Sequence, residues 1–162
     1  MKESWKRFVR IMFIVYIAVL LLFVVFKVLP DLHVFGNIQD IYRNRSYGYH
    51  KFNLIPFKTI WKYTRSIGYD YAFINLFGNI IPFMPFGFLL PLFMKKKMNF
   101  WKTAAVGMAF SLACEITQDL TMTGFFDVDD IILNTLGVMV GYWCLLAAGR
   151  IVAYIKKKKA AA

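Results

Sequence analysis

The residues of this chain that could do chemistry are a few carboxylates set within or beside apolar stretches. Glu115 lies inside an otherwise uncharged run, and Asp127 and Asp130 directly precede another. A carboxylate buried among apolar side chains must be protonated, paired or bound to a metal ion. Such groups could exchange a proton with a substrate as general acid or base, or hold a ligand by hydrogen bonds.

Amide and hydroxyl side chains recur at helical spacing on the same stretches. Residues three, four or seven positions apart share one face of a helix. The residues grouped in this way are Asn75 with Asn79, Ser111 with Glu115 and Gln118, and Asp130 with Asn134. Such side chains could contact a ligand, but they also hold neighbouring helices together by hydrogen bonds, so both roles stay open.

The elements that must position these residues are four apolar stretches. Apolar residues make up 59% of the 162 positions and charged residues 18%, which is too apolar for an ordinary soluble domain. A bilayer core needs about 20 helical residues. The sequence therefore predicts one all-α, polytopic membrane domain over residues 1–159, with the final alanines 160–162 foreign to it. Its transmembrane helices are expected at about 8–29, 71–94, 102–120 and 130–150.

The distribution of lysine and arginine predicts the orientation of the spans. The N-terminal segment, the 95–102 connection and the C-terminal tail together carry thirteen Lys and Arg residues, whereas the 119–130 connection has four aspartates and no base. With four spans, the basic pieces lie on one side, which the positive-inside rule makes cytoplasmic. We therefore expect a multi-pass protein with cytoplasmic N- and C-termini and with the long 30–70 loop outside.

The 30–70 loop is itself basic, with six Lys and Arg residues against three acids. Bases on the outer side could meet the phosphate of an anionic headgroup, and the candidates are Arg43, Arg45, Lys51 and Arg65. Within the loop, apolar residues follow an i, i+3, i+4 pattern over residues 57–64. This periodicity predicts an amphipathic helix that either lies in the outer membrane interface or covers the helix bundle.

Under this topology the polar residues fall at one depth. At a rise of 1.5 Å per residue, Asn75 and Asn79 lie roughly 6–12 Å from the outer end of their span, and Glu115 lies about 9 Å from the outer end of the next. Asp130 and Asn134 lie about 3–9 Å from the outer end of the last span. We therefore expect three helices to bring polar side chains to one level in the outer half of the membrane.

Structural roles compete with chemical ones for the carboxylates. Asp127 stands where a helix begins and could cap it, Asp129 is expected to be exposed, and Glu115 could pair with a base of the outer loop. The sequence has no His-x-x-x-His or Cys-x-x-Cys pattern, and the acids lack the spacing of a Ca²⁺ loop. We predict no metal and no cofactor, although these acids could supply oxygen ligands to a divalent cation. Nucleic acid is not an expected partner, because the bases flank membrane spans.

Four short motifs occur in order along the chain. They are NLIPF at 53–57, GNIIPFMPFGFLL at 78–90, SLACEITQ at 111–118 and DVDDIILNTLG at 127–137. Together they resemble the signatures of the VanZ-like family of small bacterial membrane proteins, over about residues 11–141. The residues that match are Asn53, Asn79, Ser111, Glu115, Gln118, Asp127, Asp130 and Asn134.

The resemblance implies a place in the bacterial cytoplasmic membrane and a link to antibiotic resistance. The family's namesake is an accessory of glycopeptide-resistance clusters and gives low-level resistance to teicoplanin, a lipoglycopeptide. The resemblance brings no established catalytic role to any residue of this chain. It adds Asn53 to the residues that could bind a ligand.

Three functions stay open from the sequence. The first is binding of an anionic amphiphile of the outer leaflet, such as a membrane lipid, a polyprenyl-phosphate wall precursor, a teichoic-acid lipid anchor or the lipoglycopeptide itself. The second is an intramembrane enzyme acting on such a lipid, with Glu115 as general acid or base and with Asp127 and Asp130 orienting it. The third is a small transporter or flippase, which would need to form oligomers because four spans are few for transport. The sequence leaves the oligomeric state undetermined.

Overall fold

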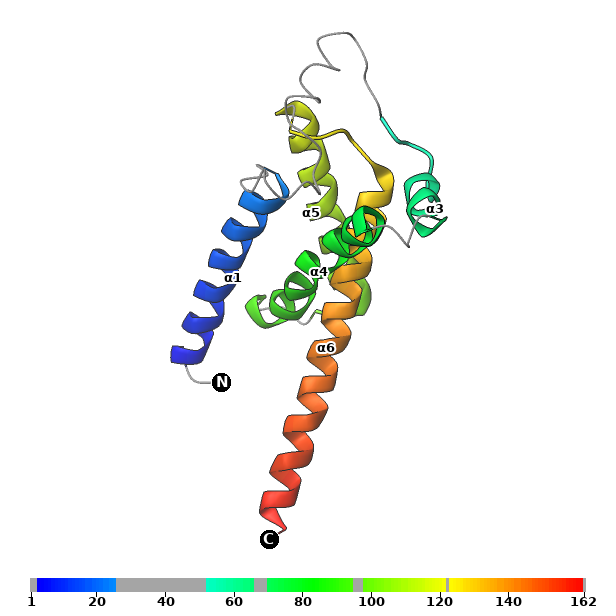
Figure 1. Cartoon of the computed structure of the whole chain (residues 1–162). Coiled ribbons are helices and arrows are strands. Elements are labelled where there is room, and N and C mark those ends of the chain that lie inside the picture. Colours follow the sequence, from blue (N-terminus) through cyan, green and yellow to red (C-terminus); the bar gives the residue numbers. More distant parts are fainter. Residues whose placement is uncertain (1–2, 26–51, 66–69, 95–97, 122, 162) are drawn as a thin grey trace.

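A computed structural model of the chain describes residues 3–25, 52–65, 70–94, 98–121 and 123–161 (Figure 1). Within these ranges the chain is helical, and its elements in order are α1 (Glu3–Val24), α3 (Lys58–Arg65), α4 (Asp70–Phe93), α5 (Phe100–Leu120) and α6 (Val128–Ala160). One isolated parallel bridge, between Asn53 and Asp127, is the β pairing of the described residues. The all-α prediction is confirmed.

Three of the described helices, α1, α4 and α6, are long and apolar enough to cross a membrane. Helix α1 begins at Glu3 rather than at residue 8, and α6 continues to Ala160 rather than ending near 150. Helix α5 occupies the third predicted span but lacks the hydropathy of the other three, because it carries three charged residues and several hydroxyl and amide side chains. The amphipathic stretch predicted at 57–64 forms α3, whose place in the membrane interface stays a prediction.

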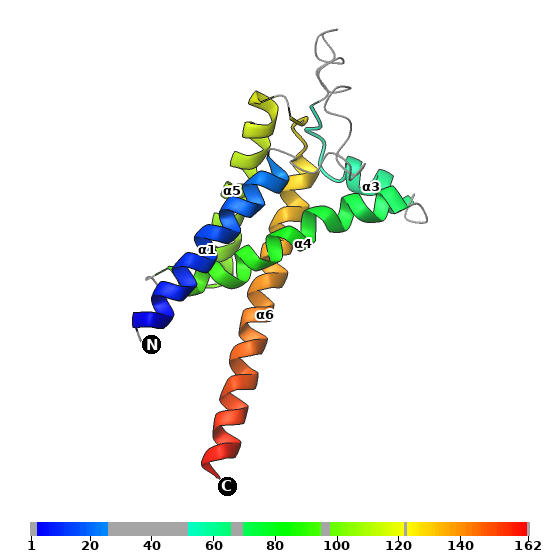
Figure 2. The same ribbon diagram turned by 60° about the vertical axis from the view of Figure 1, so that its left-hand side comes forward.

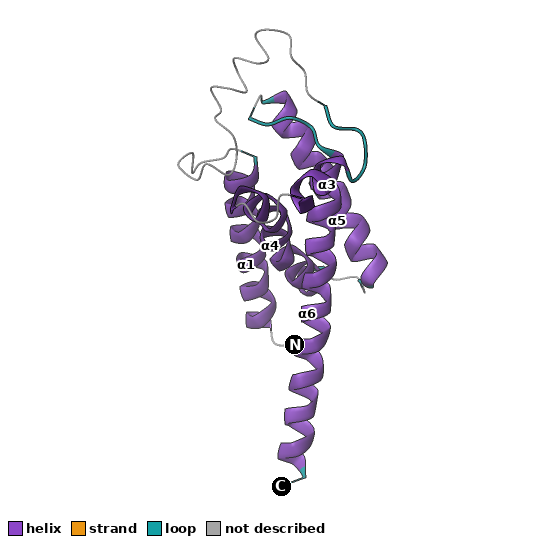
Figure 3. Ribbon diagram, turned by 45° about the vertical axis from the view of Figure 1, so that its right-hand side comes forward, coloured by secondary structure: helices purple, strands orange, loops and turns teal. Residues whose placement is uncertain are grey.

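Helices α4 and α6 form the centre of the bundle, and α4 contacts each of the other described helices. Helix α6 contacts α4, α5 and α3, while α1 packs on α4. Helix α4 crosses α6 obliquely (Figure 2) and lies between α1 and α6 (Figure 3). The first turn of α1 and the last turns of α6 point toward the same end of the molecule (Figures 1 and 2).

The crossing of α4 and α6 depends on glycines. A Cβ atom placed on Gly141 would lie 1.8 Å from the Met84 carbonyl oxygen, and one placed on Gly137 would lie 2.1 Å from that of Ile80. On the α4 side, a Cβ on Gly87 would lie 1.9 Å from a carbonyl oxygen of α6. Only residues without a side chain permit this approach of the two backbones. The small-xxx-small pattern at 137–141 therefore packs helices within one chain.

Aromatic side chains join α1 and α5 to the same crossing. The ring centroids of Phe13 and Phe93 are 4.6 Å apart, and those of Phe86 and Phe110 are 5.0 Å apart. The Tyr16 hydroxyl donates to the Pro82 carbonyl oxygen at 2.6 Å. Helix α4 continues without a break through its three internal prolines, so the prolines do not divide the second span.

Candidate functional site

A short bridge joins the 52–57 segment to the beginning of α6. The Asn53 backbone N–H donates to the Phe126 backbone carbonyl oxygen (2.9 Å), and the Val128 backbone N–H donates to the Asn53 backbone carbonyl oxygen (3.0 Å). The Asn53 side-chain Nδ2 donates to Asp127 Oδ1 at 2.7 Å and to Thr59 Oγ1 at 3.0 Å. Through its main chain and its side chain, Asn53 thus attaches the 52–57 segment to the beginning of α6 and to α3.

Asp127 is the residue at which three elements meet. Its Oδ1 accepts from the Asp129 N–H at 2.8 Å and caps α6, which is the structural role that its position predicted. Its Oδ2 accepts from the Thr59 hydroxyl at 2.7 Å. Its own N–H donates to Oε2 of Glu115, a buried residue of α5, at 3.1 Å. The Asp127 side chain therefore links the beginning of α3 to the beginning of α6, and its backbone N–H links both to α5.

Asp129 is fully buried, and the expectation that it would be exposed is wrong. Its Oδ1 accepts from the Phe57 N–H at 2.5 Å, and its Oδ2 accepts from the N–H groups of Thr59 (2.6 Å) and Ile60 (3.0 Å). The first N–H groups of a helix have no partner inside the helix. Phe57, which precedes α3 with a φ of 67°, has no side chain that could cap them. Asp129 supplies the missing acceptor from α6, and its negative charge suits a helix N-terminus.

Two further hydrogen bonds involve residues that lie farther along α6, toward its C-terminus. Asn79 Nδ2 of α4 donates to Asp130 Oδ1 at 2.6 Å, and Asn134 Nδ2 donates to Ser111 Oγ of α5 at 2.8 Å. Ser111 and Asn134 are both buried, and the Asn134 Oδ1 atom has no hydrogen-bond partner among the described residues. The structure thus brings residues of α4, α5 and α6 into contact, as their common depth predicted, while their role toward a ligand stays a prediction.

The family assignment rests on a match along most of the chain. The model of the VanZ/LLP1 family matches residues 13–151, a range that contains every contact of this network. The chain belongs to the VanZ/LLP1 family. Comparison with curated proteins and with solved structures gave no match. The resemblance seen in the four motifs is confirmed at the level of the family.

Not every predicted site residue of this VanZ/LLP1 protein joins the network. Gln118 Nε2 donates instead to the Val24 carbonyl oxygen at 2.6 Å and links α5 to the end of α1. Asn75 is half-buried on α4, one turn before Asn79, and stays a predicted ligand-binding residue. The guanidinium of Arg65 lies 4.6 Å from the centroid of the Trp61 ring. The other three predicted bases, Arg43, Arg45 and Lys51, lie outside the described residues.

Two members of the network were not predicted, namely Thr59 and Asp129. A signal for Asp129 was present, because a helix predicted to begin near Phe57 has no capping side chain of its own and needs an acceptor from elsewhere. The acids that follow Asp127 have the carboxylate oxygens that could accept from these N–H groups. Their distance of about 70 residues along the chain hid the pairing.

The carboxylates of the network accept hydrogen bonds from N–H and hydroxyl donors, and they belong to Glu115, Asp127, Asp129 and Asp130. Among the described residues, no three His, Cys, Asp or Glu side chains are grouped as a metal site would require. Two cavities on the α4–α6 pair, of about 300 and 790 Å³, include no residue of the polar network. The geometry of the network is that of a junction, which fixes α3 and the 52–57 segment against the ends of α5 and α6.

Proposed function

We propose that this VanZ/LLP1 protein is a four-span membrane protein whose outer end binds an anionic amphiphile, either a membrane lipid or a lipid-linked envelope precursor. The observation that carries the proposal is helix α3. Its eight residues include Lys58, Lys62 and Arg65 and no acid. Beside these bases, the side chains of Phe57 and Trp61 are 62% and 61% exposed. Bases and an exposed aromatic ring on one short helix, with a second exposed ring directly before it, are typical of an element that lies among lipid headgroups.

The network explains how such a helix is kept in place. Isolated helices of eight residues are marginal in water, because nucleation is costly. Asp129 satisfies the first N–H groups of α3, and Asn53 and Asp127 hold the segment that precedes it. We therefore assign the buried polar residues a positioning role, with the bases of α3 making the contact to the anionic headgroup.

The distribution of side chains on α5 supports the fourth span. The polar residues Ser111, Glu115 and Gln118 are buried inside the bundle. Leu112 and Ile116, on another face of the same helix, are exposed. A helix with its polar face inward and its apolar face outward is suited to a lipid environment, even though its mean hydropathy is low. Four spans also agree with α1 beginning and α6 ending at the same end of the molecule (Figure 1).

The proposed orientation places that common end in the cytoplasm. The bases near the start of α1, at Lys102 and in the tail of α6 outnumber those of α3, and the positive-inside rule then puts α3 outside. A protein that binds amphiphiles at the outer surface could reduce the access of a lipoglycopeptide to the membrane. We accordingly propose low-level teicoplanin resistance as the cellular consequence, to be measured as drug susceptibility with and without the expressed protein.

An intramembrane enzyme is the second function weighed from the sequence. It would require Glu115 to exchange a proton with a substrate. Glu115 Oε2 instead accepts the Asp127 N–H, and the residue is 2% exposed. Binding by α3 is therefore the function that we propose.

The test measures binding of undecaprenyl phosphate to the purified full-length chain by native mass spectrometry. The triple variant Lys58→Gln, Lys62→Gln, Arg65→Gln removes three charges from α3. With about 1 kcal/mol for each base near an anionic surface, its affinity is expected to fall roughly 100-fold. The matched control, Lys157→Gln, Lys158→Gln, Lys159→Gln, removes the same charge from the tail of α6 and is expected to bind as the wild type does. Equal affinity of the α3 variant and the wild type would refute the proposal.

A further inference from the structure

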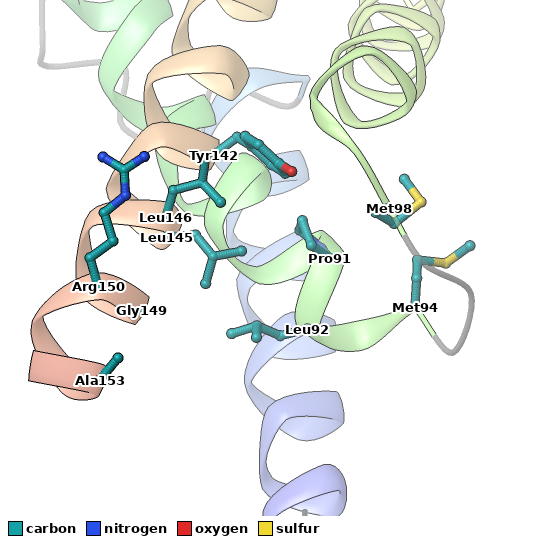
Figure 4. A pocket seen from close by; sticks show the side chains of 10 residues that line it. All are labelled: Pro91, Leu92, Met94, Met98, Tyr142, Leu145, Leu146, Gly149, Arg150 and Ala153. Atoms are coloured by element: carbon teal, nitrogen blue, oxygen red, sulfur yellow. The ribbon is translucent and has the colours of Figure 1, made fainter. Parts of the chain in front are cut away.

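A second site lies on the part of α6 that extends beyond the bundle, far along the helix from the polar network (Figure 1). There the end of α4 and residues 142–153 of α6 form an open groove of about 790 Å³ (Figure 4). Leu92 and Met98 line one side of it, and Leu145 and Gly149 line the other. This groove shares no residue with the network at the outer end.

The floor of the groove suits a hydrocarbon chain. Its lining is apolar apart from the Tyr142 hydroxyl and Arg150. Met94 and Met98 are flexible side chains that adapt their shape to an apolar ligand. A Cβ atom on Gly149 would meet no atom within 4 Å, so the floor is open at this glycine. Apolar clefts of this size are typical of small-molecule binding sites.

The depth of the groove matches the division between acyl chains and headgroups. The uncharged stretch of α6 runs over residues 131–149 and ends at Arg150. About 20 helical residues cross a bilayer core, so Arg150 lies at the level of the headgroups. Leu145 and Leu146 then lie roughly 6–8 Å deeper, among the acyl chains. Figure 4 shows the Arg150 side chain on the flank of α6, outside the apolar floor, with its guanidinium extending back along the helix toward the level of Tyr142.

The charge of this end selects among lipids. Arg150 and the lysines at 156–159 give the last turns of α6 five positive charges, and α6 has no acid after Asp130. Arg150 is exposed, and its guanidinium offers a fork of donors that matches a phosphate. Basic pockets between transmembrane helices attract anionic headgroups.

We propose that this groove binds an anionic phospholipid of the leaflet at the basic end of the protein. One acyl chain lies between the end of α4 and residues 142–149 of α6, and the phosphate meets Arg150. The site depends on α6 crossing a membrane and is separate from the binding proposed at α3, which lies toward the opposite end of the molecule.

Native mass spectrometry of the full-length chain, titrated with dioleoyl phosphatidylglycerol or dioleoyl phosphatidylcholine, tests the proposal. The wild type is expected to retain phosphatidylglycerol in preference. Gly149→Leu fills the floor of the groove, and the open space at that position allows it to do so without a clash, so the bound lipid is expected to be lost from a folded protein. Arg150→Gln is expected to weaken phosphatidylglycerol binding about fivefold and phosphatidylcholine binding less, because the choline cation offsets the charge of the phosphate that both lipids carry.

Two controls separate this site from others. Lys159→Gln removes the same charge outside the groove lining and is expected to weaken phosphatidylglycerol binding less than Arg150→Gln does. The triple variant of α3 is expected to have no effect on phosphatidylglycerol binding, so failure of one proposal does not imply failure of the other. Retention of phosphatidylglycerol by Gly149→Leu, equal binding of the two lipids by the wild type, or a dimer that covers the groove would each overturn the inference.

Discussion

Replacement of Asp129 gives the most direct test of how α3 is held in place. In Asp129→Ala, the N–H groups of Phe57, Thr59 and Ile60 lose their acceptor. A hydrogen bond contributes about 1 kcal/mol net, and bonds to a charged group contribute somewhat more. Loss of three such bonds should weaken the docking of α3 by about 3 kcal/mol. Helix α3 is too short to persist without that docking, so the effect is expected to be local to residues 57–65.

Amide hydrogen exchange of the purified protein measures this effect directly. A loss of about 3 kcal/mol predicts that the three amides exchange roughly 100-fold faster in Asp129→Ala than in the wild type. Amides in the middle of α6 should keep their protection, because the bundle does not depend on α3. The control variant is Glu3→Gln, which removes an exposed carboxylate at the far end of the molecule.

The variant Asp129→Asn tests whether both carboxylate oxygens are needed as acceptors. It keeps the shape of the side chain but replaces one accepting oxygen by a donating NH₂ group. Because both carboxylate oxygens accept backbone N–H groups here, one of them would then face a donor. We expect Asp129→Asn to be nearly as damaging as Asp129→Ala. Unchanged exchange of the Phe57, Thr59 and Ile60 amides in both variants would refute the docking role of Asp129.

Two further predictions concern the bundle and are measured as thermal unfolding in detergent. Gly141→Ala should lower the midpoint of thermal unfolding by many degrees, because its Cβ would lie 1.8 Å from a backbone oxygen. Gly149→Ala, the control, should leave the midpoint unchanged. A tolerated Gly141→Ala would contradict the close crossing of α4 and α6. Ser111→Ala should cost about 1–3 kcal/mol, because the buried Asn134 amide loses its partner. The double variant Ser111→Ala, Asn134→Leu removes both polar groups and should recover much of that loss; a double variant no more stable than the single one would argue against an unsatisfied amide as the cause.

The helices of this protein were largely predictable, because their signals are local. Runs of apolar residues of membrane length are visible without any knowledge of neighbours, and they became α1, α4 and α6. The periodicity over 57–64 became α3 for the same reason. The inward face of α5 was also visible, since Ser111, Glu115 and Gln118 share a side of any helix that contains them.

The pairings between these elements were decided by the tertiary structure alone. Asp129 reaches the first N–H groups of α3, and Asn53 reaches Asp127, across about 70 residues of chain. No periodicity connects residues so far apart, because their contact depends on how α4 crosses α6. Glycines at 87, 137 and 141 allow that crossing by letting the backbones approach each other. Sequence alone therefore determined which faces are polar, whereas packing decided which acid caps which helix, since a buried carboxylate takes whatever donors the fold brings to it.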